Sequence, residues 1–128
     1  MKKDFITRLK EAIHQEPLLM DEVVGQLREI AEVVRGMAKP NVEVDVVPGF
    51  ATVHGQQFNF SIKLIHGDYV CSNETLFRAY VPTGGYPVHL DLMQEDLTVC
   101  VDAQEFQNAI LGFFARPAVR CHILGFLK

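Results

Sequence analysis

The amino-acid sequence predicts an α+β fold in which an antiparallel meander of about five or six strands carries N-terminal and C-terminal helices on one face. Apolar residues recur every three or four positions near both ends of the chain, as on amphipathic helices, and they alternate singly in between, as in half-buried strands. Only short turns separate the predicted strands, whereas parallel strands would need crossover helices between them. The predicted order is α-α-β-β-β-β-β-α-α, in a single domain over residues 1–128.

The first predicted helix follows Asp4, whose short acidic side chain is a good N-cap. Its apolar residues return at helical spacing as far as Ile13, and Pro17 then interrupts the pattern. We expect this segment to form a helical pair, or one bent helix, with the helix that follows, and to pack on the rest of the fold.

The second predicted helix has the clearest apolar stripe in the chain. The stripe consists of Leu19, Val23, Leu27, Ile30, Val34 and Met37. Gly36 and Lys39-Pro40 supply the stop signal. Val24 and Val33 lie off the stripe, so a helix with one buried face would leave both partly exposed.

From Asn41 the apolar period becomes that of a strand. Valines alternate with acidic residues over 42–46, Pro48-Gly49 is expected to end that strand, and residues 50–54 form a second short run. The strand from Gln57 to Ile65 is expected to be central. Its apolar face is Phe58, Phe60, Ile62 and Leu64, and its polar face is Gln57, Asn59, Ser61 and Lys63.

Three further strand regions precede the last helices. Residues 69–81 are rich in strand formers with a break near Ser72, which leaves one long irregular strand or two short ones open. Residues 88–92 alternate with Val88 on the apolar side, and residues 97–101 have apolar odd positions. We expect each apolar side to face the helices.

Two helices are predicted at the C-terminal end. Asp102 and Glu105 have the spacing of a capping box, and Pro117 suits the first turn of the last helix. The apolar faces comprise Phe106, Ala109, Ile110, Phe113 and Phe114 in one helix, and Val119, Ile123, Phe126 and Leu127 in the other. Leu111 falls off the stripe and is expected to be partly exposed.

Composition and charge argue against several classes of function. Hydrophobic residues make up 48% of the chain and charged residues 22%, as in an ordinary globular protein. The formal net charge of −4 argues against a nucleic-acid binder, which normally carries a basic surface for phosphates. No run of about 18 apolar residues occurs, so no membrane span is expected. Arg8, Lys10 and Glu11 interrupt the apolar core that a signal peptide needs, so the cytoplasm is the expected compartment.

The five histidines and three cysteines lack the spacing of a metal site. Zinc ligands usually come in close pairs, whereas here only Cys121 and His122 are near in sequence, and a helix would turn them about 100° apart. We therefore expect no metal and no cofactor. Together with Cys71 and Cys100, Cys121 is expected to be reduced and mostly buried.

The polar sheet face is the candidate binding site. Its candidate residues are Asn59, Ser61, Lys63, Arg78, Tyr80, Tyr86, His89 and Asp91. His89 and Asp91 project from the same side of one strand, and a carboxylate can orient an imidazole for general-base chemistry. Because no nucleophile stands at a recognisable spacing, a solvated or interface pair is the preferred interpretation and no catalytic residue is assigned.

Two hypotheses for function follow. The first is a small acidic non-enzymatic adaptor that binds a protein partner, or itself as a homo-oligomer, through the sheet face or exposed apolar helix positions. The second is a small-molecule-binding protein, or a modest enzyme, that uses the polar sheet face around His89 and Asp91. Convergence of the polar residues in a concave pocket would favour the second.

Overall fold

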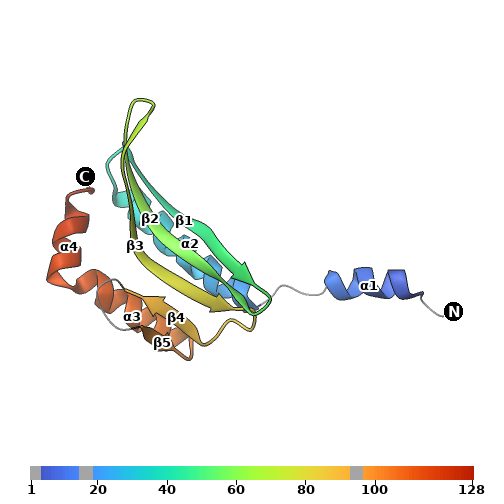
Figure 1. Ribbon diagram of the computed structural model, residues 1–128. Helices are drawn as coiled ribbons and strands as arrows, with labels where there is room; N and C mark the ends of the chain where they lie inside the picture. The colour runs from blue at the N-terminus through green and yellow to red at the C-terminus, as the bar shows by residue number, and fades with distance from the viewer. Residues whose placement is uncertain (1–3, 15–18, 93–96) are drawn as a thin grey trace.

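The computed structural model describes residues 4–14, 19–92 and 97–128. Within them the predicted order α-α-β-β-β-β-β-α-α is confirmed (Figure 1). The helices are α1 (Phe5–Ile13), α2 (Leu19–Met37), α3 (Ala103–Ala115) and α4 (Pro117–Leu124), and the strands are β1 (Val42–Thr52), β2 (Gly55–His66), β3 (Tyr69–Pro82), β4 (Val88–Asp91) and β5 (Thr98–Cys100).

The five strands form one antiparallel sheet in the order β1-β2-β3-β4-β5. Each strand is joined to the next by a short connection, so the sheet is a simple meander. The helices α2, α3 and α4 contribute buried residues to the same core cluster as one face of this sheet. The other face, called the open face below, carries Gln57, Asn59, Arg78, Tyr80, His89 and Asp91 and is not covered by these helices.

The strand β2 has the two-sided character that its alternating sequence predicts. Phe58, Phe60 and Ile62 are buried against the helices. Phe60 stacks on Phe77 of β3, and the Phe77 ring meets the edge of Phe113 of α3 at 5.5 Å. The core therefore lies between the middle of the sheet and the helices α2 and α3, as the apolar pattern predicts.

The strand β1 is longer than predicted, and of the two alternatives for residues 69–81 the single long strand is confirmed. The strand β1 does not end at Pro48 but continues to Thr52, with a shift in its pairing to β2 between Pro48 and Ala51. Such a bulge lets a strand pass a proline, which has no backbone N–H for the ladder. Residues 69–82 form one long irregular strand, β3, with two register shifts against β2.

The predicted buried face of the last strand is wrong. In β5 the pairs Val88–Cys100 and Leu90–Thr98 place the even positions beside core residues of β4. Because strand side chains alternate, the apolar odd positions are turned to the open face, where Leu97, Val99 and Val101 are exposed. Cross-strand register, not the pattern of β5 itself, decides which side is buried.

The helix α1 does not pack on the fold as the sequence analysis expects. It has an N-cap as predicted, since the Asp4 carboxylate accepts a hydrogen bond of 2.7 Å from the Thr7 N–H. None of its residues is buried, however, and Figure 1 shows it lying apart from the sheet and the other helices. Its apolar residues Phe5, Ile6, Leu9 and Ile13 are exposed.

The stripe of α2 is buried in its centre and exposed at its ends. Val23, Leu27 and Val34 are buried, whereas Leu19 and Met37 are exposed. The expectation for Val24 is wrong, because it is buried beside Val23. The segment between β3 and β4 also contacts the start of α2. The N–H of Met20 donates to the Thr83 carbonyl at 3.4 Å, and Gly85 approaches Leu19.

The predicted helix starts near the C-terminus are confirmed. The Asp102 carboxylate accepts from the Glu105 N–H at 2.9 Å, and the Glu105 carboxylate reaches back to the Val101 N–H at 2.7 Å. Pro117 opens α4. Among the described residues, no helix is long and apolar enough to cross a membrane.

Candidate functional site: an apolar groove between helices

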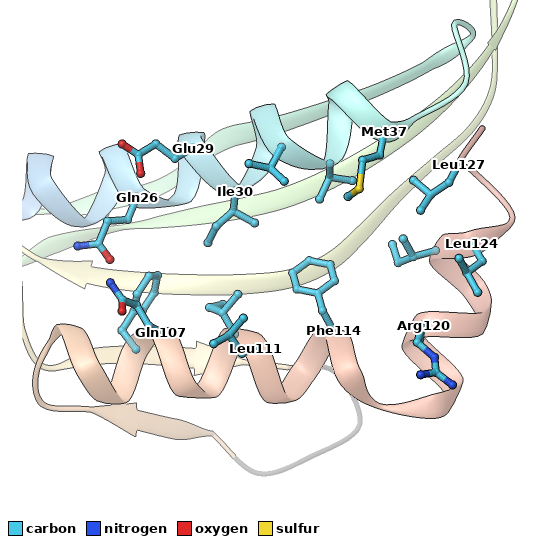
Figure 2. Close-up of a pocket in the computed structure, with 15 residues that line it drawn as sticks. Gln26, Glu29, Ile30, Met37, Gln107, Leu111, Phe114, Arg120, Leu124 and Leu127 are labelled. Atoms are coloured by element: carbon cyan, nitrogen blue, oxygen red, sulfur yellow. The ribbon is translucent and has the colours of Figure 1, made fainter.

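An apolar groove with a volume of about 630 Å³ runs between α2 on one side and α3 and α4 on the other (Figure 2). It exists because the two long helices lie toward opposite edges of the sheet. The helix α2 packs mainly over β1, and α3 packs over β5. Their facing sides are therefore separated above the middle of the sheet. The volume lies within the range of pockets that hold a ligand or the side chains of a partner.

The groove has a buried base and exposed walls. Val34, Ile110 and Ile123 at the base belong to the core cluster. On the walls, Val33 of α2 is 63% exposed and Leu111 of α3 is 68% exposed. Both exposures are predicted by their positions off the helix stripes. A contiguous apolar surface of this kind usually marks a binding site.

Other wall residues extend the apolar surface along the whole groove. Ile30 of α2 faces Leu111 and Phe114 of α3, and Met37 lies near Leu124 and Leu127 at the far end (Figure 2). From Gln26 to Met37, the groove follows about 16 Å of α2. That length equals about three helical turns.

Polar residues stand at the ends of the groove. Gln26, Glu29 and Gln107 gather at one end, and Arg120 lies at the other (Figure 2). Glu29 and Arg120 are exposed, so their charges are solvated at the rim. The groove thus has an apolar floor with an acidic end and a basic end.

Backbone hydrogen bonds fix the width of the groove at its basic end. The Lys39 N–H donates to the Phe126 carbonyl at 2.9 Å, and the Lys128 N–H donates to the Met37 carbonyl at 3.0 Å. The Lys39 ammonium also donates to the Gly125 carbonyl at 3.1 Å. The C-terminal segment is thereby tied to the end of α2, which holds α4 in place as a wall. A binding surface built on fixed helices is preorganised.

The open face of the sheet brings together most of the polar residues that the sequence analysis selects. The register places Gln57, Tyr80 and His89 in one row across the strands, and Asn59, Arg78 and Asp91 in the next. Gln57, Arg78, Tyr80, His89, Asp91 and Leu97 line a cavity of about 440 Å³. Gln57 and Leu97 are not among the predicted site residues.

Local contacts order this polar cluster. The Gln57 amide donates to the Asn59 carbonyl oxygen at 3.0 Å, and the Arg78 guanidinium lies 3.8 Å from the Asp91 carboxylate. The Tyr80 hydroxyl is 3.4 Å from the Thr52 hydroxyl. Arg78 and Asp91 are both well exposed, so solvent screens their ion pair.

Three predicted site residues lie elsewhere. Ser61 is buried between Asp45 of β1 and Thr75 of β3, and Lys63 is farther along β2, between Glu43 and Asn73. The remaining residue, Tyr86, packs against the core cluster instead of facing the open sheet. Burial raises the pKa of its hydroxyl, and the neighbouring Gln26 side chain opposes this effect.

The cysteines differ from the sequence expectation of mostly buried thiols. Cys100 is buried, but Cys71 and Cys121 are exposed, and all three are free. Burial raises the pKa of the Cys100 thiol, and the carboxylates of Glu105 and Asp102 raise it further. Cys100 is therefore a weak nucleophile at neutral pH. In the described part of the chain, no three side chains of the metal-binding kinds come together.

Comparison of the chain with protein-family models, with curated proteins and with solved structures gave no match. A proposal about function rests on the groove and on the open face.

Proposed function

We propose that the protein is a non-enzymatic interaction module whose groove between α2 and α3–α4 binds an amphipathic helix of a protein partner. The observation that carries this proposal is the exposure of Val33 and Leu111 on the walls of one continuous apolar groove. Exposed aliphatic side chains lose contact with water when a partner covers them, and each fully buried one contributes roughly 1.5–3 kcal/mol.

The shape and chemistry of the groove suit a helix. Helix-in-groove recognition places apolar side chains three, four and seven positions apart into an apolar channel. The groove follows about three turns of α2, and its charges stand at the rim. The open channel therefore offers apolar contact to one face of a helix and leaves the polar face in solvent. A reducing cytoplasm suits the two exposed thiols, Cys71 and Cys121.

Binding of a defined probe tests this proposal. The probe is a fluorescein-labelled 15-residue peptide of leucine, alanine and lysine, with its leucines on one helical face. We expect its fluorescence anisotropy to rise with micromolar affinity when the full chain is titrated. Leu111→Glu places a charge in the groove and should weaken binding at least tenfold.

Val53→Glu is the matched control, because Val53 is 87% exposed and does not line the groove. This variant should bind the probe like the wild-type chain. Equal affinities for all three proteins, or no binding by any of them, would remove the groove as a helix-binding site.

The second candidate function is recognition of a small anionic molecule on the open face. The observation in its favour is the cavity of about 440 Å³, where the Arg78 guanidinium and the side chains of Tyr80 and His89 converge. These groups donate hydrogen bonds of the kind that carboxylates and phosphates accept.

Proton NMR of the His89 ring tests the second candidate. Titration with inorganic phosphate and with succinate should shift this resonance at millimolar concentrations in the wild-type chain and not in Arg78→Ala. A His89 resonance that stays constant in both titrations speaks against an anion site on the open face.

A further inference from the structure

We infer that the groove of one copy receives α1 of a second copy, so that two chains exchange their N-terminal helices in a symmetric dimer. This inference rests on the proposed function, because it names the helix that the groove binds. It joins two apolar surfaces that the structure leaves exposed in the same chain.

The helix α1 has an apolar face without a covering surface. Phe5, Leu9 and Ile13 lie four positions apart, Ile6 lies three before Leu9, and all four residues share one side of the helix and are exposed. The helix has 9 residues, whereas isolated helices shorter than about 12–15 residues are marginal in water. A helix of this length gains its stability from contact with another surface. The apolar face of α1 is the side that would make this contact.

The dimensions of α1 match those of the groove. Nine helical residues span about 13 Å, and the groove follows about 16 Å of α2 from Gln26 to Met37. The residues Phe5, Leu9 and Ile13 succeed one another at intervals of one turn, as anchors in a helix-binding groove do. The apolar face of α1 is therefore no longer than the apolar channel.

One orientation of α1 in the groove allows two charged pairs. Glu29 stands at the end near Gln26, and Arg120 stands at the opposite end (Figure 2). With α1 antiparallel to the α2 that it covers, Lys10 comes to the end that carries Glu29, and Asp4 comes to the end that carries Arg120. The reverse orientation would break both of these pairs.

The position of α1 in its own chain favours a second copy as the source of the bound helix. A helical hairpin with a short connection would set α1 beside the first turns of α2, from Leu19 onward, whereas the groove begins at Gln26. In its own chain, α1 lies apart from the sheet and the other helices, and none of its residues is buried (Figure 1). The α1 of a second copy can cover the groove, and the reciprocal contact closes the assembly as a symmetric dimer.

Mass measurement by light scattering on four full-chain proteins tests this inference. They are the wild type, the α1 variant Ile6→Asp/Leu9→Asp, the groove variant Leu111→Glu and the control Val53→Glu. All the changed side chains are exposed, so circular dichroism should show the same fold in each. We expect dimers for the wild type and the control, and an at least tenfold weaker dimer for the α1 and groove variants.

Mixing the α1 variant with the groove variant supplies a stricter test. The mixture contains one intact α1 and one intact groove, on different chains, so it should form a heterodimer more tightly than either variant forms a homodimer. A wild-type chain that stays monomeric at 100 µM, or a dimer that both the α1 and the groove variants leave unchanged, overturns the inference.

The leucine-rich probe separates the two proposals. Both this probe and a labelled peptide of residues 4–14 are titrated with the α1 variant. If only the leucine-rich probe binds, and Leu111→Glu weakens that binding, the helix-binding function stands and the second-copy inference fails. If neither peptide binds, both proposals fail.

Discussion

The rings of Phe60 in β2 and Phe77 in β3 stack across the two strands, with their centroids 4.8 Å apart and their planes 12° apart. Phe114 of α3 meets both rings edge-on, at 6.0 Å from Phe60 and 6.2 Å from Phe77. This aromatic cluster joins the middle of the sheet to the helix that forms one wall of the groove. The wall is therefore anchored to the most deeply buried part of the molecule.

Replacement of Phe60 tests the core directly. Phe60→Ala removes a fully buried ring and leaves a cavity beneath α3, so it should lower the free energy of unfolding by about 3–5 kcal/mol. Urea denaturation followed by circular dichroism measures the change. Phe50→Ala is the control, because Phe50 is 72% exposed and should cost less than about 1 kcal/mol. A loss below 1 kcal/mol for Phe60→Ala would contradict the placement of Phe60 in the core.

The sequence predicts this core well because an element with one buried face has apolar residues at regular intervals. The alternation of Phe58 and Phe60 with polar neighbours predicts residues 57–65 as a strand, and β2 spans Gly55–His66. The pattern fails for β5, where pairing with β4 buries Cys100 and exposes Val99. In a three-residue strand, the register of the neighbour outweighs the side-chain pattern.

The candidate site is predicted only in part, because it depends on how separate elements are placed relative to one another. The off-stripe positions of Val33 and Leu111 indicate exposed apolar surface, and both are exposed. Val33 and Leu111 line one groove because α2 and α3 are separated on the sheet. No local sequence pattern predicts that separation. The amphipathic pattern of α1 likewise predicts a helix but not that its apolar face lies uncovered in a single chain.

Two glycines offer a matched test of the local backbone. A Cβ on Gly55 would stand 2.5 Å from the Val81 carbonyl oxygen and 2.8 Å from the Pro82 Cα, so Gly55→Ala must displace the backbone of β3. We expect it to destabilise the fold by about 1–3 kcal/mol. Gly112→Ala, in the exposed middle of α3 with open space around it, should stabilise the fold by about 0.4–1 kcal/mol. Thermal denaturation of both variants measures the two signs, and a stabilised Gly55→Ala would contradict the close approach of β2 to β3.

Thiol labelling tests the placement of the three cysteines. At pH 8, Ellman's reagent should react quickly with Cys71 and Cys121 and much more slowly with Cys100, which is buried and has a raised pKa. Mass spectrometry of the labelled peptides identifies each site. Fast labelling of Cys100 in the folded chain would show that β5 does not lie beneath the helices.

The raised pKa of Cys100 also predicts the pH dependence of stability. The folded state favours the neutral thiol, so its contribution is fully present below the ordinary thiol pKa of 9.0. That contribution is lost as the pH rises from there through the folded-state value. The free energy of unfolding should therefore fall above about pH 9, and fall less steeply in Cys100→Ala. Parallel slopes for the two proteins would show that Cys100 does not carry this dependence.

The ion pair between Arg78 and Asp91 should contribute little to stability. Both side chains are about two-fifths exposed and their charged atoms are 3.8 Å apart, so a double-mutant cycle should give a coupling of about 0–1 kcal/mol. The single variants Arg78→Ala and Asp91→Ala, with the double variant, complete the cycle in urea denaturation. A coupling above 2 kcal/mol would mean that this pair holds the open face together.

Exchange of charges tests the orientation of α1 in the groove. Lys10→Glu should weaken the dimer several-fold at low salt, because it brings a carboxylate to the end that carries Glu29. Adding Glu29→Lys should restore most of the lost affinity, as measured by sedimentation. If the double variant is weaker than Lys10→Glu alone, α1 does not lie antiparallel to α2.

The central claim is that the groove between α2 and α3–α4 binds α1. Methyl NMR tests it most directly, on the full-chain variant Ile6→Asp/Leu9→Asp, whose groove is left open. The variant is titrated with a peptide of residues 4–14. The peptide should shift the methyl resonances of Ile30, Val33, Leu111 and Leu124, which line the groove, and leave those of Val53 and Val99 unchanged. Shifts confined to the open face of the sheet, or no shifts at millimolar peptide, would contradict the groove as the seat of α1.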